Sequence, residues 1–250
     1  MMRFLCGVVL SFSVMGVCWA ASSREFDNVD DKVTISDITV ITGKSAASYA
    51  MWVYSETFPS DCTADVVMRK DGEFTLQLHD ECSGGTQQGF LAPVWGASLG
   101  TYPSQQFCAY ASFTTNTWHH VIMRWSTSAV TGDAEVYVDG ALACTVNGDD
   151  TSAIANSSAS LLYGNNESNS EDLDGQLAYT RVFDKRIADY EITQEQFMPG
   201  STVSNLQVFH MLPGESPEQD WSGNNLDSTA IAGSVSSSNG PPVMLTTGMP

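Results

Sequence analysis

Short runs rich in Val, Ile, Tyr, Phe and Trp, separated by Gly, Asn, Asp and Ser turns, recur along nearly the whole chain. This pattern is typical of antiparallel β-sheets, and no amphipathic helix of useful length interrupts it. We therefore predict an all-β fold, a two-sheet antiparallel β-sandwich in one domain, with a turn or two of helix at residues 188–192. Strands are expected at residues 32–35, 49–54, 66–70, 74–79, 107–113, 119–125, 134–138, 141–145, 160–163, 175–183 and 206–212.

The first twenty residues have the layout of a secretory signal peptide, with Arg3, an apolar run, and Cys18-Trp19-Ala20 before a cut after Ala20. An N-terminal membrane anchor is the alternative, but the run is short and interrupted by glycine. We predict a signal peptide at 1–20, a domain at 21–245 and a short C-terminal tail at 246–250. No other stretch is apolar enough to cross a bilayer, so the mature protein is expected outside the cell or at its surface, with no membrane span.

Two hairpins are expected around Asp71-Gly72 and Asp139-Gly140, because Asp-Gly favours two-residue turns. In the first hairpin Lys70 would then face Glu73. Counting outward along the two strands brings position 62 opposite position 81.

Four cysteines remain after the predicted cleavage: Cys62, Cys82, Cys108 and Cys144. An even number in an oxidising compartment predicts two disulfides, and the spacings are too wide for a zinc site. Three connectivities are possible. The hairpin register favours Cys62–Cys82, which leaves Cys108–Cys144.

Ten Lys and Arg against 29 Asp and Glu give a formal net charge of −19. A surface of this sign repels nucleic acid and anionic lipid head groups, so neither is an expected partner. The charge is compatible with neutral or cationic ligands and with calcium, and equally with solubility alone.

Two adjacent histidines, His119 and His120, lie in the predicted strand WHHVIMRWS. Side chains alternate between the two faces of a strand, so these imidazoles point to opposite sides and do not chelate one ion together. We interpret both as structural, one beside the core and one on the outer face.

Seven segments in order resemble the laminin-G-like members of the concanavalin A-like lectin/glucanase superfamily, which are related to pentraxins. They cover Phe26 to about Pro242 and read FDNVDDKVTIS, SYAMWVY, TNTWHHVIMRWS, AEVYVDGALACT, LLYGNNES, DGQLAYTRVFDKRIADYEI and DWSGNNLDS. Small departures are Asn28, Lys32 and Ile187. The resemblance implies a jelly-roll sandwich in which His119, His120 and Trp118 are structural.

Glucanases on this fold carry catalytic carboxylates spaced Glu-x-Asp-x-x-Glu on one strand, and no stretch here has that spacing. No other hydrolase or phosphate-binding motif appears. We predict no catalytic residues and no enzymatic activity, since fold kinship alone does not confer chemistry.

Calcium is a candidate ligand because relatives bind it in loops at the sheet rim, and it needs six to eight oxygen ligands. Resemblance to the pentraxin branch implies Asp71, Asn165, Asn166 and Glu167, but Gly72 and Ser168 stand where that branch has further ligands. Asp172 and Asp174, with Glu171, would have to substitute. A solvated acidic loop is the alternative interpretation.

Three aromatic residues, Phe90, Trp95 and Tyr102, lie in a polar-aromatic stretch after the first hairpin, which we interpret as a ligand-contacting loop. A core position for Trp95 is the alternative. The sequence thus predicts a secreted, non-catalytic recognition module for a glycan or glycoprotein, with calcium as a candidate cofactor. The alternatives are a structural or adhesive surface component without a small ligand and, third, a glycan-cleaving enzyme of the glucanase type.

Overall fold

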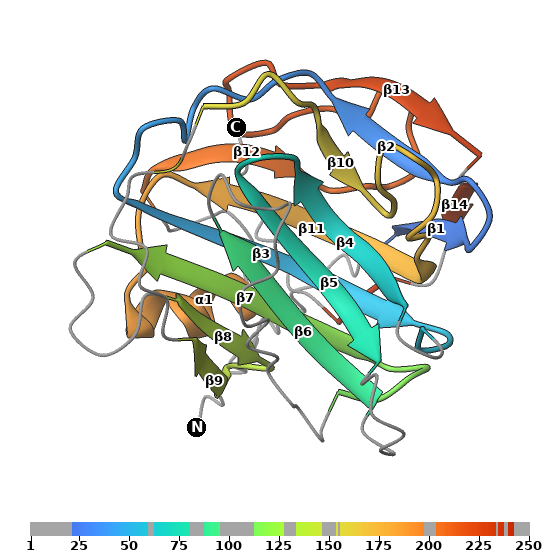
Figure 1. Ribbon diagram of the computed structural model, residues 1–250, viewed down its shortest axis with the longest axis horizontal. Helices are drawn as coiled ribbons and strands as arrows, with labels where there is room; N and C mark the ends of the chain where they lie inside the picture. The colour runs from blue at the N-terminus through green and yellow to red at the C-terminus, as the bar shows by residue number, and fades with distance from the viewer. Residues whose placement is uncertain are drawn as a thin grey trace, which may run out of the picture.

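Two antiparallel β-sheets, stacked face to face, form the molecule (Figure 1). The computed structural model describes residues 22–59, 63–80, 88–95, 113–127, 134–146, 154, 156–197, 204–233, 235–237 and 240–242. Within these residues, the predicted all-β sandwich is confirmed.

The larger, eight-stranded sheet gathers strands from both ends of the chain. Its order is β14 (Val235–Ser237), β1 (Ser23–Asp27), β11 (Asp174–Phe183), β3 (Ala46–Ser55), β7 (Trp118–Ser126), β8 (Ala134–Val138) and β9 (Ala141–Val146), with β12 (Leu206–His210) also paired to β11.

The smaller, six-stranded sheet lies in front of it in Figure 1. Its order is β13 (Ser228–Ala232), β2 (Lys32–Ile35), β10 (Leu161–Tyr163), β4 (Ala64–Lys70), β5 (Phe74–Asp80) and β6 (Gln88–Trp95).

Strand β7 shows how alternation builds the layers. Val121, Met123 and Trp125 belong to the large buried cluster between the sheets, whereas Ile122 belongs to a separate cluster on the outer face of the eight-stranded sheet. Successive side chains on a strand point to opposite faces, so one strand supplies both clusters.

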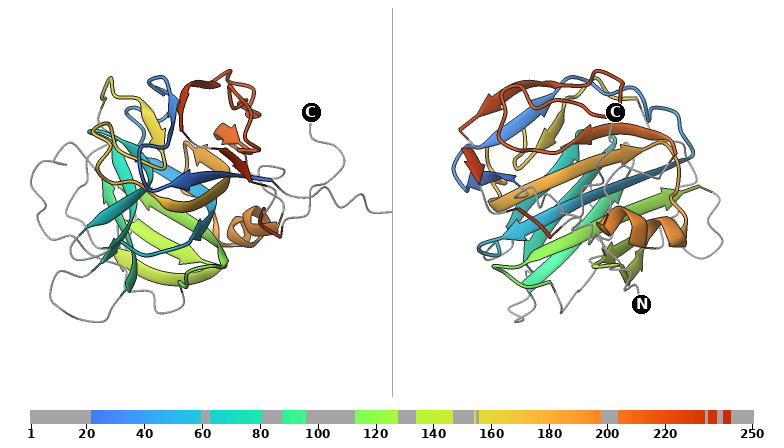
Figure 2. Two further views of the ribbon diagram at one scale, coloured as in Figure 1. Left: turned by 90° about the vertical axis from the view of Figure 1, so that its right-hand side faces the viewer. Right: turned by 180° about the vertical axis from the view of Figure 1, so that it is seen from behind.

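The described residues contain one α-helix, α1 (Asp189–Phe197), which lies against the outer face of the eight-stranded sheet (Figure 2). Ile187 and Ile192 pack there against Ala50, Ile122 and Phe183. The helical turn predicted at residues 188–192 is therefore confirmed and extends to Phe197.

Most predicted strands are confirmed within one to three residues at their ends. Four strands, β1, β6, β13 and β14, were not predicted from the sequence. The interpretation of Phe90 and Trp95 as loop residues is wrong for the backbone, because both lie in β6, opposite His79 and Phe74 of β5. The strand was obscured by Pro93, which an edge strand tolerates because its N–H need not pair; β6 is such an edge.

The turn at Asp139-Gly140 has two residues, as predicted. Val138 pairs with Ala141, and both turn residues have positive φ, 50° and 79°. This is the conformation that a type I′ turn requires, and Asp and Gly adopt it more readily than most residues.

The two-residue turn predicted at Asp71-Gly72 is wrong. Lys70 pairs with Phe74, so the turn has three residues, and the register shifts again between Val66 and Met68. This shift compensates for the extra turn residue, so Ala64 lies opposite His79. A two-residue turn with Lys70 facing Glu73 would give the same pairing at that position.

Several expectations fall on residues outside the described ranges. These are the signal peptide at 1–20, the strand at 107–112, Tyr102, Cys62, Cys82 and Cys108. The domain boundaries at 21–245 also stay a prediction, although the described strands run from Ser23 to Ser237. Over the part of the chain that is described, no helix is long and apolar enough to cross a membrane.

Candidate functional site

His119 and His120 point to opposite faces of β7, and each is held by protein groups. His119 places Nδ1 2.8 Å from Asp139 Oδ2, and its Nε2 accepts the Thr114 N–H at 3.1 Å. His120 Nε2 lies 3.1 Å from Arg181 Nη2, and burial, then the Arg181 charge, lower the pKa of His120 well below its usual value. The geometry supports the structural interpretation of the pair.

The loop after β10 holds four of the predicted calcium ligands, and the side chains of three of them bind within the loop itself. Asn165 donates to Asp172 Oδ1 and accepts the Asn166 N–H at 2.7 Å. Asn166 Oδ1 accepts the N–H groups of Ser168 and Ser170 at 2.9 and 3.1 Å. These amides therefore fix the loop conformation.

Two of the remaining predicted ligands, Asp71 and Asp174, lie outside that loop. Since β10 runs antiparallel to β4, the turn with Asp71 lies beside the start of β10, whereas Asn165 follows its end. Asp71 is paired with Arg69, which also binds Glu171 at 2.9 Å, and Glu167 is exposed. Among the described residues, no three or more His, Cys, Asp or Glu side chains meet in an arrangement that would hold a metal ion.

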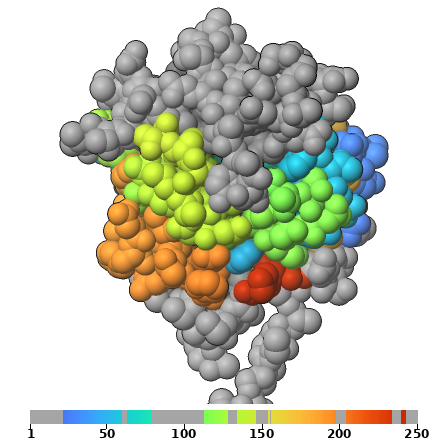
Figure 3. All heavy atoms as spheres, turned by 90° about the horizontal axis from the view of Figure 1, so that it is seen from below, coloured from blue at the N-terminus to red at the C-terminus, as the bar shows by residue number. Residues whose placement is uncertain are grey.

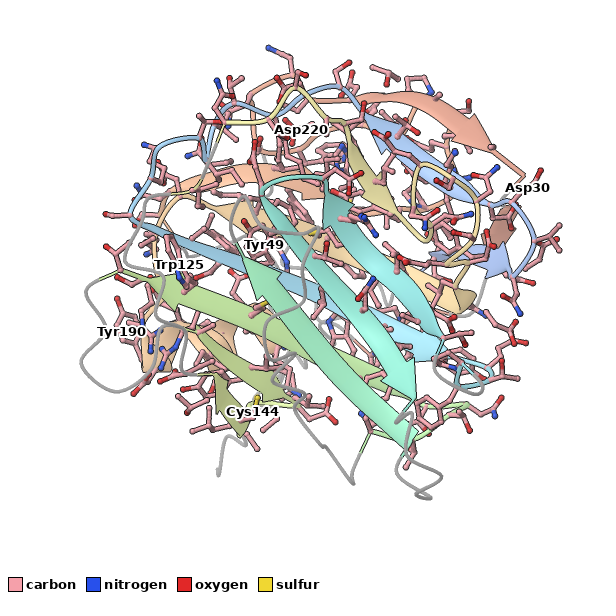
Figure 4. The ribbon with its side chains drawn as sticks, in the orientation of Figure 1. Asp30, Tyr49, Trp125, Cys144, Tyr190 and Asp220 are labelled. Carbon is pink, nitrogen blue, oxygen red and sulfur yellow. The ribbon has the colours of Figure 1, made fainter. Side chains whose placement is uncertain are left out.

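Carboxylates crowd together at one edge of the sandwich, the edge where Asp30 is labelled in Figure 4. We define this acidic rim by the electrostatic couplings among its members, Asp27, Asp30, Asp31, Glu56, Asp65, Glu171, Asp172 and Asp174. They come from the β1–β2 loop, the segment after β3, the start of β4 and the segment leading into β11.

Burial and like charge disfavour ionisation in the acidic rim. Burial, followed by the charges of Asp174, Asp172 and Glu171, raises the pKa of Asp65 to about 7. Burial also raises the pKa of Asp31 to about 6, with smaller contributions from neighbouring carboxylates. Such shifts mark carboxyl groups that lack a compensating cation.

Helix α1 begins at a residue set by its own side chains. Glu191, in its first turn, reaches back to accept the Ala188 N–H at 2.7 Å, which is one half of a capping box. Lys185 binds the other carboxylate oxygen of Glu191 at 2.7 Å. The cap fixes the segment before the helix and turns Tyr190 outward, with 69% of its surface exposed.

An open pocket of about 580 Å³ lies at this end of the helix. We call it the α1 pocket; it is lined by Arg124, Arg186, Ile187, Ala188, Asp189 and Tyr190. Figure 3 shows the orange surface of this segment against the yellow-green surface of β8 and β9.

Arg124, on β7, has all five N–H groups engaged by protein acceptors. Nε donates to Glu135 Oε2 at 2.7 Å, and Nη2 lies 2.7 Å from Tyr137 Oη and 2.5 Å from Glu135 Oε2. Nη1 reaches the Ile187 carbonyl at 2.9 Å and Asp189 Oδ1 at 2.6 Å. The guanidinium is thus a fixed scaffold that orients the two carboxylates.

Glu135 is shared between two arginines. Arg186 binds its second oxygen, Oε1, at 2.8 Å. Burial acts to raise the pKa of Glu135, but hydrogen bonds from Arg124 and Tyr137 and the two arginine charges outweigh it and lower the pKa. Glu135 is therefore ionised at neutral pH. Together with Glu135 behind them, the lining residues Arg124, Arg186 and Asp189 sum to zero formal charge.

The α1 pocket was not predicted from the sequence. The predicted aromatic contacts were Phe90 and Trp95, which lie in β6, and Tyr102, outside the described residues. Tyr190 lies in the stretch where we predicted a helical turn, and an aromatic residue between two acids at a helix start was the available signal. Cys144, labelled in Figure 4, is disulfide-bonded in β9, but its partner is not among the described residues, so the predicted pairings stay predictions.

Residues 27–193 match the protein family described as the concanavalin A-like lectin/glucanases superfamily. Among curated proteins, none matches the chain. Three solved structures share the fold at low sequence identity.

The first is a "putative carbohydrate binding protein" from Bacteroides ovatus, with a TM-score of 0.67 and 17% identity over 89% of this chain and 61% of that one. The second is a heptameric SAP-like pentraxin from Limulus polyphemus, with a TM-score of 0.52 and 14% identity over 70% of this chain and 82% of that one. The third is domain 4 of an extracellular arabinanase from Geobacillus stearothermophilus in complex with arabinotriose, with a TM-score of 0.50 and 16% identity over 69% of this chain and 75% of that one. This chain thus spans less than two thirds of the Bacteroides protein.

Proposed function

Because the chain belongs to the concanavalin A-like lectin/glucanase superfamily, we propose that it is a non-catalytic carbohydrate-binding protein and that the α1 pocket receives the sugar. The observation that carries the proposal is the outward ring of Tyr190 beside carboxylates held in fixed positions by Arg124. An aromatic face packs on the apolar face of a sugar ring, and oriented oxygens accept its hydroxyl protons.

Two observations favour binding over cleavage. Glycoside hydrolysis needs a carboxylic acid that keeps its proton near neutral pH beside an ionised carboxylate. Glu135, which is bound to the pocket-lining Arg124 and Arg186, has a lowered pKa and does not supply that proton. Asp65 has a raised pKa but is only 7% exposed, on the acidic rim.

The proposal includes export and leaves calcium as a separate prediction. Export rests on the signal-like segment 1–20, and N-terminal sequencing of protein recovered from culture medium tests it. The α1 pocket contains none of the predicted calcium ligands, so the proposed binding does not depend on an ion. Equal glycan affinity in calcium and in excess chelator is expected.

The proposal is tested by binding of Tyr190→Ala to an immobilised panel of plant and microbial oligosaccharides. We expect the affinity to fall about tenfold, which corresponds to about 1.4 kcal/mol of lost ring contact. Phe197→Ala is the matched control, because Phe197 ends the same helix and is 43% exposed, yet does not line the α1 pocket. Equal losses in both variants would place the sugar elsewhere. No binding to any oligosaccharide would refute the proposed function and favour a structural or adhesive role.

A further inference from the structure

The α1 pocket offers hydrogen-bond acceptors and withholds its donors. The five N–H groups of Arg124 are all engaged. Arg186 places Nη2 on Glu135, and its Nη1, which has no hydrogen-bond partner, is buried away from solvent. Neither guanidinium therefore presents the open two-pronged face that binds a carboxylate or sulfate.

Asp189 is the charged group that a ligand would meet. Its side chain is 86% exposed although one oxygen is bound to Arg124. Tyr190 follows it directly and provides the aromatic face. A carboxylate beside an aromatic ring accepts hydroxyl protons well and repels another anion.

The charge of the whole chain acts in the same direction. The pocket has no net formal charge of its own, and the chain carries −19. An acidic glycan approaching it is repelled at low ionic strength, because the two local cations, Arg124 and Arg186, are already paired with carboxylates.

We propose that the α1 pocket is specific for neutral, hydroxyl-rich sugars and discriminates against uronic, sulfated and sialylated ones. This rests on the proposed function, since it assigns the ligand class of the same site. The discrimination comes from Asp189, which is exposed, and from Arg124, whose donors are all engaged within the protein.

Calorimetric titration with hexasaccharides of matched length tests the proposal, with cellohexaose, xylohexaose and arabinohexaose as neutral probes and hexagalacturonate and a hyaluronan hexamer as acidic ones. At least one neutral probe should bind at least tenfold more tightly than either acidic probe, with little change between about 20 and 500 mM salt. Tighter or equal binding of an acidic probe would overturn the specificity while leaving carbohydrate binding intact. If none of the probes binds and the larger oligosaccharide panel is also negative, the proposed function fails as well.

The variant Asp189→Asn tests whether the negative charge of Asp189, rather than the shape of its side chain, excludes acidic sugars. The amide keeps one acceptor oxygen but removes the negative charge, so we expect weaker binding of the neutral probe and a gain of at least fivefold for hexagalacturonate. Glu167→Gln removes one charge from an exposed position outside the α1 pocket and should change neither affinity. An unchanged affinity of Asp189→Asn for hexagalacturonate, or the same gain in Glu167→Gln, would contradict the role of Asp189.

Discussion

The α1 pocket and the acidic rim lie at opposite edges of one sandwich, where Figure 4 labels Tyr190 and Asp30. Around α1 nearly every charge faces a partner of opposite sign. On the acidic rim carboxylates face carboxylates, and burial raises several of their pKa values. Among the described residues the charge is therefore unevenly distributed, and the α1 pocket lies where charges are balanced.

The cations of the chain explain the difference. Five of them lie around α1 or the segment leading into it, and each is bound to a carboxylate: Lys44 to Asp184, Arg124 to Glu135 and Asp189, Arg181 to Glu195, Lys185 to Glu191, and Arg186 to Glu135. On the acidic rim Arg69 reaches Glu171. Fixed, neutralised charges orient a ligand, whereas crowded like charges cost stability, so the two regions should respond oppositely to mutation.

The largest expected effect comes from the buried ion pair that joins β11 to α1. Arg181 and Glu195 are both fully buried, with Nη1 2.6 Å from Oε2. Arg181→Ala leaves a buried carboxylate without its cation and should lower the free energy of unfolding by about 3–5 kcal/mol. Urea unfolding followed by tryptophan fluorescence measures it.

A double variant, Arg181→Met with Glu195→Met, is the control for that experiment. It removes both charges and fills similar volume, so its loss should be smaller than that of Arg181→Ala. If the double variant loses as much or more, packing rather than charge balance holds α1 to the sheet, and the contrast with the acidic rim weakens.

A smaller effect of opposite sign is expected at the acidic rim from Asp65→Asn. The folded-state pKa of about 7 lies above the ordinary aspartate pKa of 3.8, so between these two pH values the folded protein holds this proton while the unfolded chain releases it. The contribution of Asp65 is favourable at low pH and declines as pH rises from about 4 to about 7. The variant should be more stable than the parent by about 2 kcal/mol at pH 8, half the upper bound from 1.36 kcal/mol per pKa unit.

Unfolding at pH 4, 6 and 8 provides the measurement. The two proteins should be closest in stability at pH 4 and diverge as pH rises. Asp30→Asn removes an exposed rim carboxylate and should shift stability by no more than about 0.5 kcal/mol. A destabilised Asp65→Asn at pH 8 would show that the Asp65 carboxylate is satisfied there.

The smallest effect belongs to an exposed pair near α1. Lys44 is 45% exposed and binds Asp184 at 2.8 Å. Lys44→Ala should cost less than about 1 kcal/mol, because exposed ion pairs are weakened by solvent and salt. A loss above 2 kcal/mol in thermal melts would mean that even exposed pairs around α1 are structurally essential.

Alternation and turn chemistry made much of the fold predictable. The opposite faces of His119 and His120 followed from strand geometry, and the Asp139-Gly140 turn from its dipeptide. The prediction of a two-residue turn at Asp71-Gly72 was wrong, because a one-residue register shift inside β4 compensates for a three-residue turn. A two-residue turn without the shift and a three-residue turn with it both pair Ala64 with His79. Local sequence does not distinguish them.

The α1 pocket was beyond prediction for a different reason. It depends on Arg124 meeting Asp189 and the Ile187 carbonyl, more than sixty residues apart in the chain. Only packing of the helix on the sheet brings them together. Single-sequence patterns report local periodicity and leave such encounters undetermined.

The last strands of the chain have a practical consequence for anyone who wishes to produce the protein. β13 extends one sheet beside β2 and β14 extends the other beside β1, so the C-terminal segment crosses between the layers at the seam where the N-terminal segment crosses. Gly233 lies at that crossing with φ +62°, and a Cβ there would come within 1.7 Å of Asp31 Oδ1. The family match ends at residue 193, before β12, β13 and β14. Recombinant protein trimmed to that boundary would expose the backbone edges of β1 and β2 and should precipitate, so expression work needs the chain at least through Ser237.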